Sequence, residues 1–267
     1  MTDSRLKDFF DGFVHARSFS LFPGRIRAHR SGADLIGHSG NSRLTRLFAS
    51  LLAAAFLVAG CQSPAIAAEA TFAAPAASRT AKESGLQTAI FAGGCFWGVE
   101  AVFSHTKGVT GAVSGYHGGS KADAEYKKVS AGTTAHAEVV KVTYDPAVVR
   151  YDQLLRILFS VVADPTLKNR QGPDIGPQYR AAIIPANQEQ RAVASAYIAQ
   201  MKKSDVWSRP IVVGIEAYKT FYPAEANHQD FALKNPNHPY IKRWDAPKVA
   251  ALANMYPGLY RASFVRN

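Results

Sequence analysis

The chain has 267 residues, 47% hydrophobic and 19% charged, which is typical of one globular domain with appendages. Its net charge of +11 could suggest a nucleic-acid partner, but no basic stripe with interleaved aromatic residues accompanies it, so none is expected. Two cysteines are too few for a disulfide framework or a four-cysteine zinc site.

The first part of the chain predicts an extension followed by a targeting signal. Residues 1–42 show little periodicity and are expected to be disordered. Residues 43–60 combine two arginines with an apolar stretch that is too short for an ordinary membrane span and has the length of a signal-peptide core. We therefore expect the protein to be exported.

The end of this signal segment indicates how the protein is processed. The segment closes on Leu-Val-Ala-Gly-Cys61, which resembles a bacterial lipobox, in which the cysteine is lipidated and becomes the new N-terminus. This predicts a membrane-anchored lipoprotein that faces the periplasm or the cell exterior. Two alternatives stay open: cleavage near Ala67, which would release a soluble periplasmic protein, and an uncleaved anchor.

A flexible tether is predicted over residues 61–85, which are rich in Ala, Ser, Thr and Pro and have little to bury. The globular domain is predicted over residues 86–267. Its pattern alternates as strand, helix, strand, strand, helix, strand, which matches a ferredoxin-like, two-layer α+β sandwich with long functional loops. The expected strands are 87–92, 109–116, 138–144, 179–184 and 210–217, and the expected helices are 95–105, 151–162, 187–203, 226–233 and 248–255.

Cys95 is the strongest candidate for a reactive group. An apolar strand leads through Gly93-Gly94 into this cysteine, and a helical pattern follows it. Free N–H groups and the positive end of a helix dipole favour a thiolate there, so we expect a lowered pKa and a nucleophile. Phe96 and Trp97 would form an apolar wall beside the sulfur. The plainer alternative is a buried cysteine that packs as a small hydrophobic residue.

Glu138 is the candidate general acid. It opens a strand and shares its parity with Val140, Val142 and Tyr144, so it should point to the apolar face. Desolvation there would raise the pKa of the carboxyl group, which suits proton donation near neutral pH. From the pattern alone, an exposed Glu138 at a frayed strand end is equally compatible.

Two tyrosines could supply neutral hydrogen-bond donors. Tyr126 lies in a polar loop before Glu138, and Tyr179 follows Asp174-Ile175-Gly176. A phenol can stabilise a developing oxyanion, although a tyrosine that opens a strand is as often a packing residue. No histidine pair has the spacing of metal ligands, so no metal and no bound cofactor are expected.

The segment Gly94-Cys-Phe-Trp-Gly98 resembles the active-site motif of the A-type peptide-methionine (S)-S-oxide reductases, and the resemblance extends to about residue 260. It implies a repair enzyme that reduces the S epimer of methionine sulfoxide, free or protein-bound. Cys95 attacks sulfur while Glu138 protonates oxygen, and the resulting sulfenic acid is reduced by an external thiol, thioredoxin-like or small. A monomer is expected.

The resemblance also implies roles for other residues. Tyr126 and Tyr179 match the tyrosines that bind the sulfoxide oxygen, Phe96 and Trp97 match the methyl-binding pair, and Asp174 matches an acidic residue that positions substrate. The chain departs from the usual pattern at Ala135, where the family has Gly, and at Asn227, where it has Tyr.

Two other functions remain open from the residues alone. A thiol peroxidase or redox sensor could use the same activated Cys95, although a peroxide needs no methyl pocket. A non-enzymatic anchored binding module would leave the pKa of Cys95 near its ordinary value.

Overall fold

The computed structural model describes residues 71–266, and the N-terminal extension, the signal segment and Cys61 lie outside these residues. Within the described residues, no helix combines the length and the apolar character needed to cross a bilayer.

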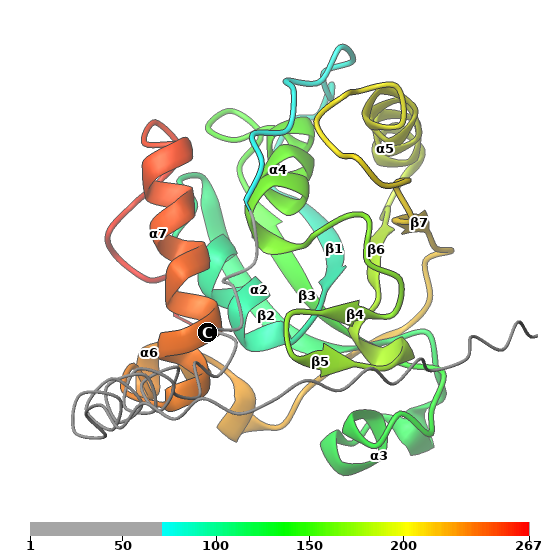
Figure 1. Cartoon of the computed structure of the whole chain (residues 1–267), viewed down its shortest axis with the longest axis vertical. Coiled ribbons are helices and arrows are strands. Elements are labelled where there is room, and N and C mark those ends of the chain that lie inside the picture. Colours follow the sequence, from blue (N-terminus) through cyan, green and yellow to red (C-terminus); the bar gives the residue numbers. More distant parts are fainter. Residues whose placement is uncertain (1–70, 267) are drawn as a thin grey trace, which may run out of the picture. The chain divides into compact units, whose positions relative to one another are not determined.

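A mixed sheet of six strands forms the centre of the domain (Figure 1), in the order β7-β6-β1-β3-β2-β8. The neighbouring pairs β6–β1, β1–β3, β3–β2 and β2–β8 are antiparallel, and β6–β7 is parallel. The strands are β1 (Gln87–Gly93), β2 (Val109–His117), β3 (Ala137–Tyr144), β6 (Ala181–Ile184), β7 (Gly214–Ile215) and β8 (Phe221–Pro223).

Helices pack against this sheet and enclose the main core. The principal ones are α2 (Phe96–Ser104), α4 (Tyr151–Ile157), α5 (Gln188–Met201) and α7 (Ala246–Met255). The residues of β3 alternate as the pattern predicted: Val140, Val142 and Tyr144 belong to the large core that includes the helices, while Ala137 and Val139 belong to a smaller cluster. Both faces of the sheet are therefore buried. Glu138 has the same parity as Val140 and Val142 and so lies on the face of the larger core.

Short elements carry the residues of the predicted loops. The pieces η1 (Lys121–Asp123) and α3 (Tyr126–Ser130) stand between β2 and β3, so Tyr126 opens a helix rather than lying in an unstructured loop. The hairpin of β4 (Arg170–Gln171) and β5 (Asp174–Ile175) and the turn η3 (Pro177–Tyr179) precede β6, so Tyr179 ends a turn and does not begin the strand.

Other predicted boundaries also change. The helix predicted over 151–162 is α-helical only to Ile157 and continues as the π-helical η2 (Leu158–Val162). The strand predicted over 210–217 contracts to β7, and the tail is divided among η4 (Ala226–His228), α6 (Phe231–Lys234), η5 (Ile241–Asp245) and α7. A proline at position 210 and a glycine at 214 limit the regular pairing of that edge strand.

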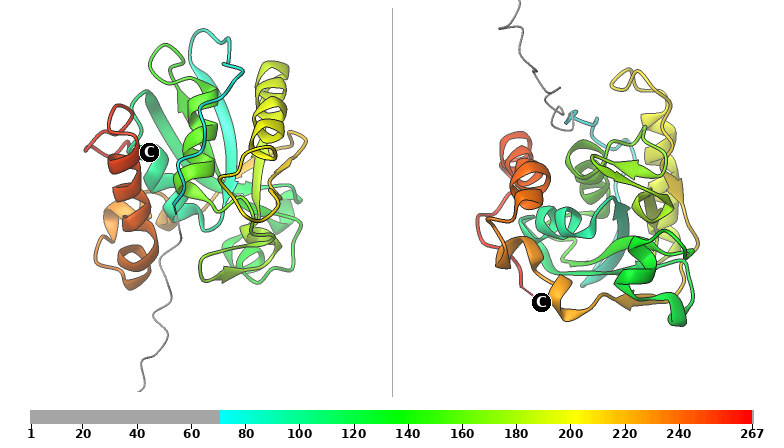
Figure 2. Two further views of the ribbon diagram at one scale, coloured as in Figure 1. Left: turned by 45° about the horizontal axis from the view of Figure 1, so that its top comes forward. Right: turned by 60° about the horizontal axis from the view of Figure 1, so that its bottom comes forward.

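The described part of the predicted tether is packed against the domain, which corrects the expectation of a flexible segment up to residue 85. Residues 71–82 run as a strap past α4 and α5 (Figure 2), in the cyan part of the chain. Ala74 is fully buried, and its N–H donates to Ser160 Oγ at 3.0 Å. The N–H of Ala81 donates to Asp152 Oδ1, also at 3.0 Å. Small residues allow this close approach, which composition alone does not distinguish from flexibility.

Candidate active site

Cys95 lies where β1 passes into α2, as the sequence predicted. Gly94 has φ of +92°, a conformation that a side chain rarely adopts, and a Cβ there would lie 2.6 Å from Cβ of Gln171 in the hairpin. Cys95 is then the N-cap residue of α2. The two glycines thus let the chain turn sharply beneath the hairpin and bring the sulfur to the helix N-terminus.

Glu138 reaches the same helix end from β3. Its side chain is 1% exposed, and Oε2 accepts the N–H of Phe96 at 2.9 Å. Burial raises the pKa of Glu138 to about 8, the hydrogen bond from Phe96 opposes this rise, and the negative charges of Asp174 and Asp245 add to it. Glu138 is therefore buried at the core face, and the alternative of an exposed strand end is wrong.

The expected thiolate at Cys95 is not what the structure supports. Burial raises the pKa of the Cys95 thiol well above its ordinary value, and the negative charges of Glu138 and Asp245 raise it further. A backbone hydrogen bond from Trp97 acts in the opposite direction but is outweighed. The physical reason is that Glu138 already occupies the first N–H of the helix, and acidic groups surround the sulfur. Burial and the acidic neighbours therefore favour the neutral thiol over the thiolate at Cys95.

Tyr126 and Tyr179 reach the site from two different elements, α3 and η3. Burial raises the pKa of Tyr126 to about 12, and the charges of Glu138 and Cys95 contribute to the rise. Burial also raises the pKa of Tyr179, with contributions from Glu138, Asp174 and Cys95. Both phenols are therefore neutral donors at physiological pH, and both are close enough to Glu138 and Cys95 to respond to their charges.

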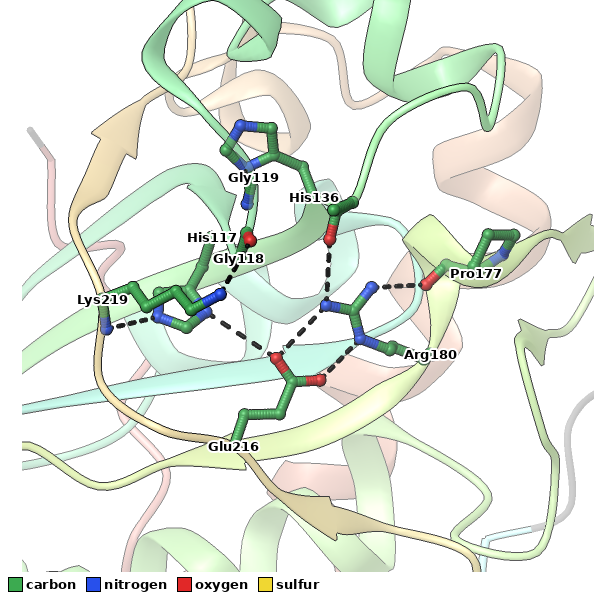
Figure 3. Close-up of polar contacts among 9 residues, drawn as sticks. His117, Gly118, Gly119, His136, Pro177, Arg180, Glu216 and Lys219 are labelled. Atoms are coloured by element: carbon green, nitrogen blue, oxygen red, sulfur yellow. Dashed lines mark hydrogen bonds and ion pairs between the residues drawn. The ribbon is translucent and has the colours of Figure 1, made fainter.

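A polar network holds the segment that carries Tyr179 (Figure 3). The guanidinium of the next residue, Arg180, forms an ion pair with Glu216 at 2.6 Å and donates to Pro177 O at 2.9 Å. The same guanidinium donates to the carbonyl of Ala135, three residues before Glu138, at 3.4 Å. Arg180 therefore connects the segment that carries Tyr179 with the segment that leads to Glu138. Ala135 has taken the place of the expected glycine without a positive φ.

Trp97 forms the apolar wall of the site. Its indole is stacked on Phe231 with the ring centroids 3.7 Å apart, and its Nε1 donates to His228 Nδ1 at 3.3 Å. Phe96, in contrast, is fully buried, with its ring centroid 6.3 Å from that of Tyr126. Trp97 is therefore the less buried member of the pair, and Phe96 packs against Tyr126 instead of facing the site as the sequence predicted.

Asp174 lies on the β4–β5 hairpin, opposite Gln171 in the register, and its carboxylate accepts the hydroxyl of Tyr240. The ring of Tyr240 meets that of Trp97 edge-on at 5.9 Å. Burial raises the pKa of Tyr240, and the next largest cause is the charge of Cys95. The structure thus brings Asp174 to the site, as predicted, together with a tyrosine that sequence reasoning missed.

The missed residues come from the tail of the chain. Tyr240 precedes η5 and Asp245 ends it, while Glu225 precedes η4 and His228 ends it. Asp245 is 1% exposed and lies against Gly98 in the first turn of α2. The Gly-Cys-Phe-Trp-Gly motif carries a partial signal for this contact, because a glycine in the first turn of a helix can mark a close neighbour.

Comparisons with known proteins agree with this geometry. A sequence profile described as "Peptide methionine sulfoxide reductase" matches residues 87–257. The protein named peptide methionine sulfoxide reductase MsrA 2 from Mesorhizobium japonicum is 56% identical over 176 residues, covering 66% of this chain and 90% of the relative. A protein of the same name from Synechocystis sp. is 47% identical over 178 residues, covering 67% and 83%.

A solved structure is similar as well. The crystal structure of Mxr1 from Saccharomyces cerevisiae in reduced form has a TM-score of 0.51 and 30% identity, and the match covers 61% of this chain and 94% of that one. With a profile match over more than half of its length, this chain belongs to the peptide methionine sulfoxide reductase family.

Proposed function

We propose that this protein reduces the S epimer of methionine sulfoxide, free or in proteins, to methionine, with Cys95 as nucleophile. The observation that carries the proposal is the pairing at the start of α2: the Cys95 thiol lies there beside a buried Glu138 of pKa about 8, which accepts the N–H of Phe96. A carboxyl group that is protonated at neutral pH can give a proton to a sulfoxide oxygen, which an ordinary carboxylate cannot.

The chemistry balances on these two groups. As the Cys95 sulfur bonds to the sulfoxide sulfur, Glu138 protonates the oxygen, and the thiol proton restores Glu138. A second proton from Glu138 lets the oxygen leave as water. Water then attacks the Cys95 sulfur, breaks the bond between the two sulfurs, releases methionine and returns a proton to Glu138. The sum is one thiol and one sulfoxide giving one sulfenic acid and one thioether, so Cys95 gains one oxygen atom and methionine is released. Because both groups are neutral at rest, the acidic surroundings of Cys95 do not oppose binding of the uncharged substrate.

Each of the remaining residues contacts a different part of the substrate. Tyr126 and Tyr179 donate hydrogen bonds to the oxygen, since both phenols are held neutral by burial beside Glu138. The indole of Trp97, which is stacked on Phe231, contacts the methyl group, while the fully buried Phe96 packs against Tyr126. Asp174, oriented by Tyr240, positions the backbone of the substrate.

Epimer specificity provides the decisive test. The purified enzyme is assayed on resolved S and R epimers of methionine sulfoxide with dithiothreitol as reductant. Turnover of the S epimer alone is expected, and no turnover of it would refute the proposal. A peroxidase function fits less well, because a peroxide needs no methyl pocket, whereas Trp97 gives this site an apolar wall.

We further propose that the four strands β6-β1-β3-β2 with α2 and α4 form a ferredoxin-like core, extended at its edges by β7 and β8. The antiparallel pairing of the four strands and their sequence order support this reading. The protein acts as a monomer, and its sulfenic acid is reduced by a thioredoxin-like or small thiol.

We also propose that the mature protein is anchored by a lipid at Cys61. Support comes from the two arginines, the apolar stretch and the lipobox-like ending of residues 43–60. The intact mass of the membrane-extracted protein tests this directly. A mass that begins after Ala67, with no lipid, would show ordinary signal cleavage instead.

A further inference from the structure

The Glu225 carboxylate contacts two segments of the site at once. Glu225 follows β8 and is the N-cap residue of η4. Its Oε1 accepts the backbone N–H of Tyr126 at 2.9 Å, and its Oε2 accepts the hydroxyl of Tyr116 at 2.7 Å. Partial burial acts against ionisation, but these hydrogen bonds outweigh it and lower the pKa of Glu225. The group is thus an ionised carboxylate with both oxygens engaged.

The bond to Tyr126 fixes the start of a short helix. Tyr126 is the first residue of α3, and the first N–H groups of a helix have no partner within it. The N-cap residue Glu125 provides no side-chain cap, so Glu225 satisfies this donor from a distant part of the chain. With five residues, α3 is too short to hold its own position, and the place of Tyr126 therefore depends on this contact.

The other bond fixes Glu225 itself. Tyr116 is fully buried in β2 and lies directly opposite Glu138 in the β2–β3 register. A hydroxyl on a buried ring of the central sheet is a rigid donor. The chain of contacts from Glu138 through Tyr116 and Glu225 to Tyr126 thus connects the proton donor to a phenol of the proposed oxygen site.

Glu225 also supports the apolar side of the site. Its carbonyl accepts the N–H of His228 at 2.9 Å and closes η4. His228 is stacked on Tyr126, with ring centroids 4.1 Å apart, and accepts the indole N–H of Trp97. The contact with His228 uses the backbone carbonyl of Glu225, so the side-chain substitutions below leave it in place.

We propose that Glu225 is a positioning residue, which holds the Tyr126 hydroxyl in line with Glu138 and Cys95. This inference rests on the proposed function, because it concerns the placement of a group that binds the sulfoxide oxygen. Glu225 does not touch the reacting atoms and acts through Tyr126.

A double-mutant cycle tests the inference. Glu225→Ala should lower kcat by about 10- to 100-fold, the range expected for a displaced donor. In a Tyr126→Phe background, the same change should lower kcat by less than about threefold, because the hydroxyl it positions is already gone. In a Tyr179→Phe background, the losses should multiply, since Tyr179 is held by a different network.

The neighbouring acid offers a matched control. Glu125 is exposed, and the structure gives its side chain only a 3.7 Å ion pair with Lys128. Glu125→Ala should therefore keep kcat within about twofold, as is typical of surface pairs. Glu225→Gln should recover most of the activity, because the amide oxygen can accept from Tyr126 while the amide nitrogen donates to the oxygen of Tyr116.

A readout independent of turnover completes the test. Hydrogen exchange of the Tyr126 amide should quicken in Glu225→Ala and stay slow in Glu225→Gln. If Glu225→Ala does not fold, Tyr116→Phe takes its place in the cycle and should show the same coupling to Tyr126→Phe. Losses that multiply with Tyr126→Phe as they do with Tyr179→Phe would overturn the inference. A wild-type enzyme inactive on the S epimer would instead refute the proposed function.

Discussion

Replacing Glu138 with glutamine tests the central element of the mechanism. With a pKa of about 8, about 90% of Glu138 carries a proton at pH 7, whereas a carboxyl of pKa 4.5 would be protonated less than about 1% of the time. Burial thus increases the protonated fraction of Glu138 roughly 300-fold at that pH. The glutamine keeps an oxygen for the Phe96 N–H but delivers no proton, so the sulfoxide step should slow by about 10²–10⁴.

The pH dependence of the rate tests whether Glu138 reacts in its protonated form. The reactive form carries the proton on Glu138, so the rate should stay level below pH 8 and fall about tenfold per pH unit well above it. The assay is a single turnover on the S epimer without reductant, with the methionine formed measured by chromatography. Because no reductant is present, the measured rate does not include the pH-dependent recycling by thiols. The glutamine variant should not show the fall in rate above pH 8.

Three results would contradict this reasoning. The first is a limb centred near pH 4.5, and the second is a glutamine variant within about tenfold of the wild-type rate, because losses of a general acid are larger. The third is an effect confined to KM, which would mean that Glu138 only binds substrate.

The stability of the folded protein should also depend on whether the Glu138 carboxyl group is ionised. The pKa of Glu138 in the folded protein lies above its unfolded value, so its contribution is fully present below pH 4.5 and is lost as pH rises through 8. Thermal unfolding of the glutamine variant should therefore depend less on pH, with a higher Tm than wild type at pH 9. An equal decline of both proteins between pH 5 and 9 would exclude a buried, protonated Glu138.

Three further changes test the frame of the site. Cys95→Ser should abolish reduction, and turnover within about tenfold of wild type would remove Cys95 from its role. Gly94→Ala should lower both kcat and Tm, because a φ of +92° is strained for alanine and Gln171 of the hairpin leaves no room for a methyl group. An unchanged kcat would contradict this. Asp152→Ala should cost about 1–3 kcal/mol by freeing the N–H of Ala81 in the strap and the guanidinium of Arg150, while kcat is kept, and the exposed Asp205→Ala is the control.

The local features of the site could be predicted from the sequence because local rules decide them. Two glycines between an apolar strand and a helical pattern predict a sharp turn with Cys95 at the helix start, which is what the structure contains. The parity of Glu138 with Val140 and Val142 indicates which face of the sheet it shares, because side chains alternate along a strand, although the pattern alone left an exposed strand end equally open. Both inferences need only a few neighbouring residues.

The electrostatics of the site could not be predicted in this way. The pKa of Cys95 depends on Glu138, Asp174 and Asp245, which come from three segments far apart in the sequence. A helix N-terminus by itself favours a thiolate, and only the folded arrangement shows that burial and acidic neighbours outweigh it. The same reason hid Tyr240 and Glu225, whose loop-rich surroundings show no periodicity.

Recycling of the oxidised enzyme gives a last prediction. Cys95 is the one cysteine within the described residues, and no other follows it in the sequence up to Asn267. The other thiol of the sequence, Cys61, would be a thioether if it is lipidated and could not exchange. The sulfenic acid on Cys95 should therefore persist until an external thiol reduces it. Thiol mapping by mass spectrometry after one turnover without reductant should find a dimedone adduct on Cys95 that is absent when methionine sulfoxide is left out. A disulfide between Cys61 and Cys95 in the membrane-derived enzyme would rule out this single-cysteine cycle.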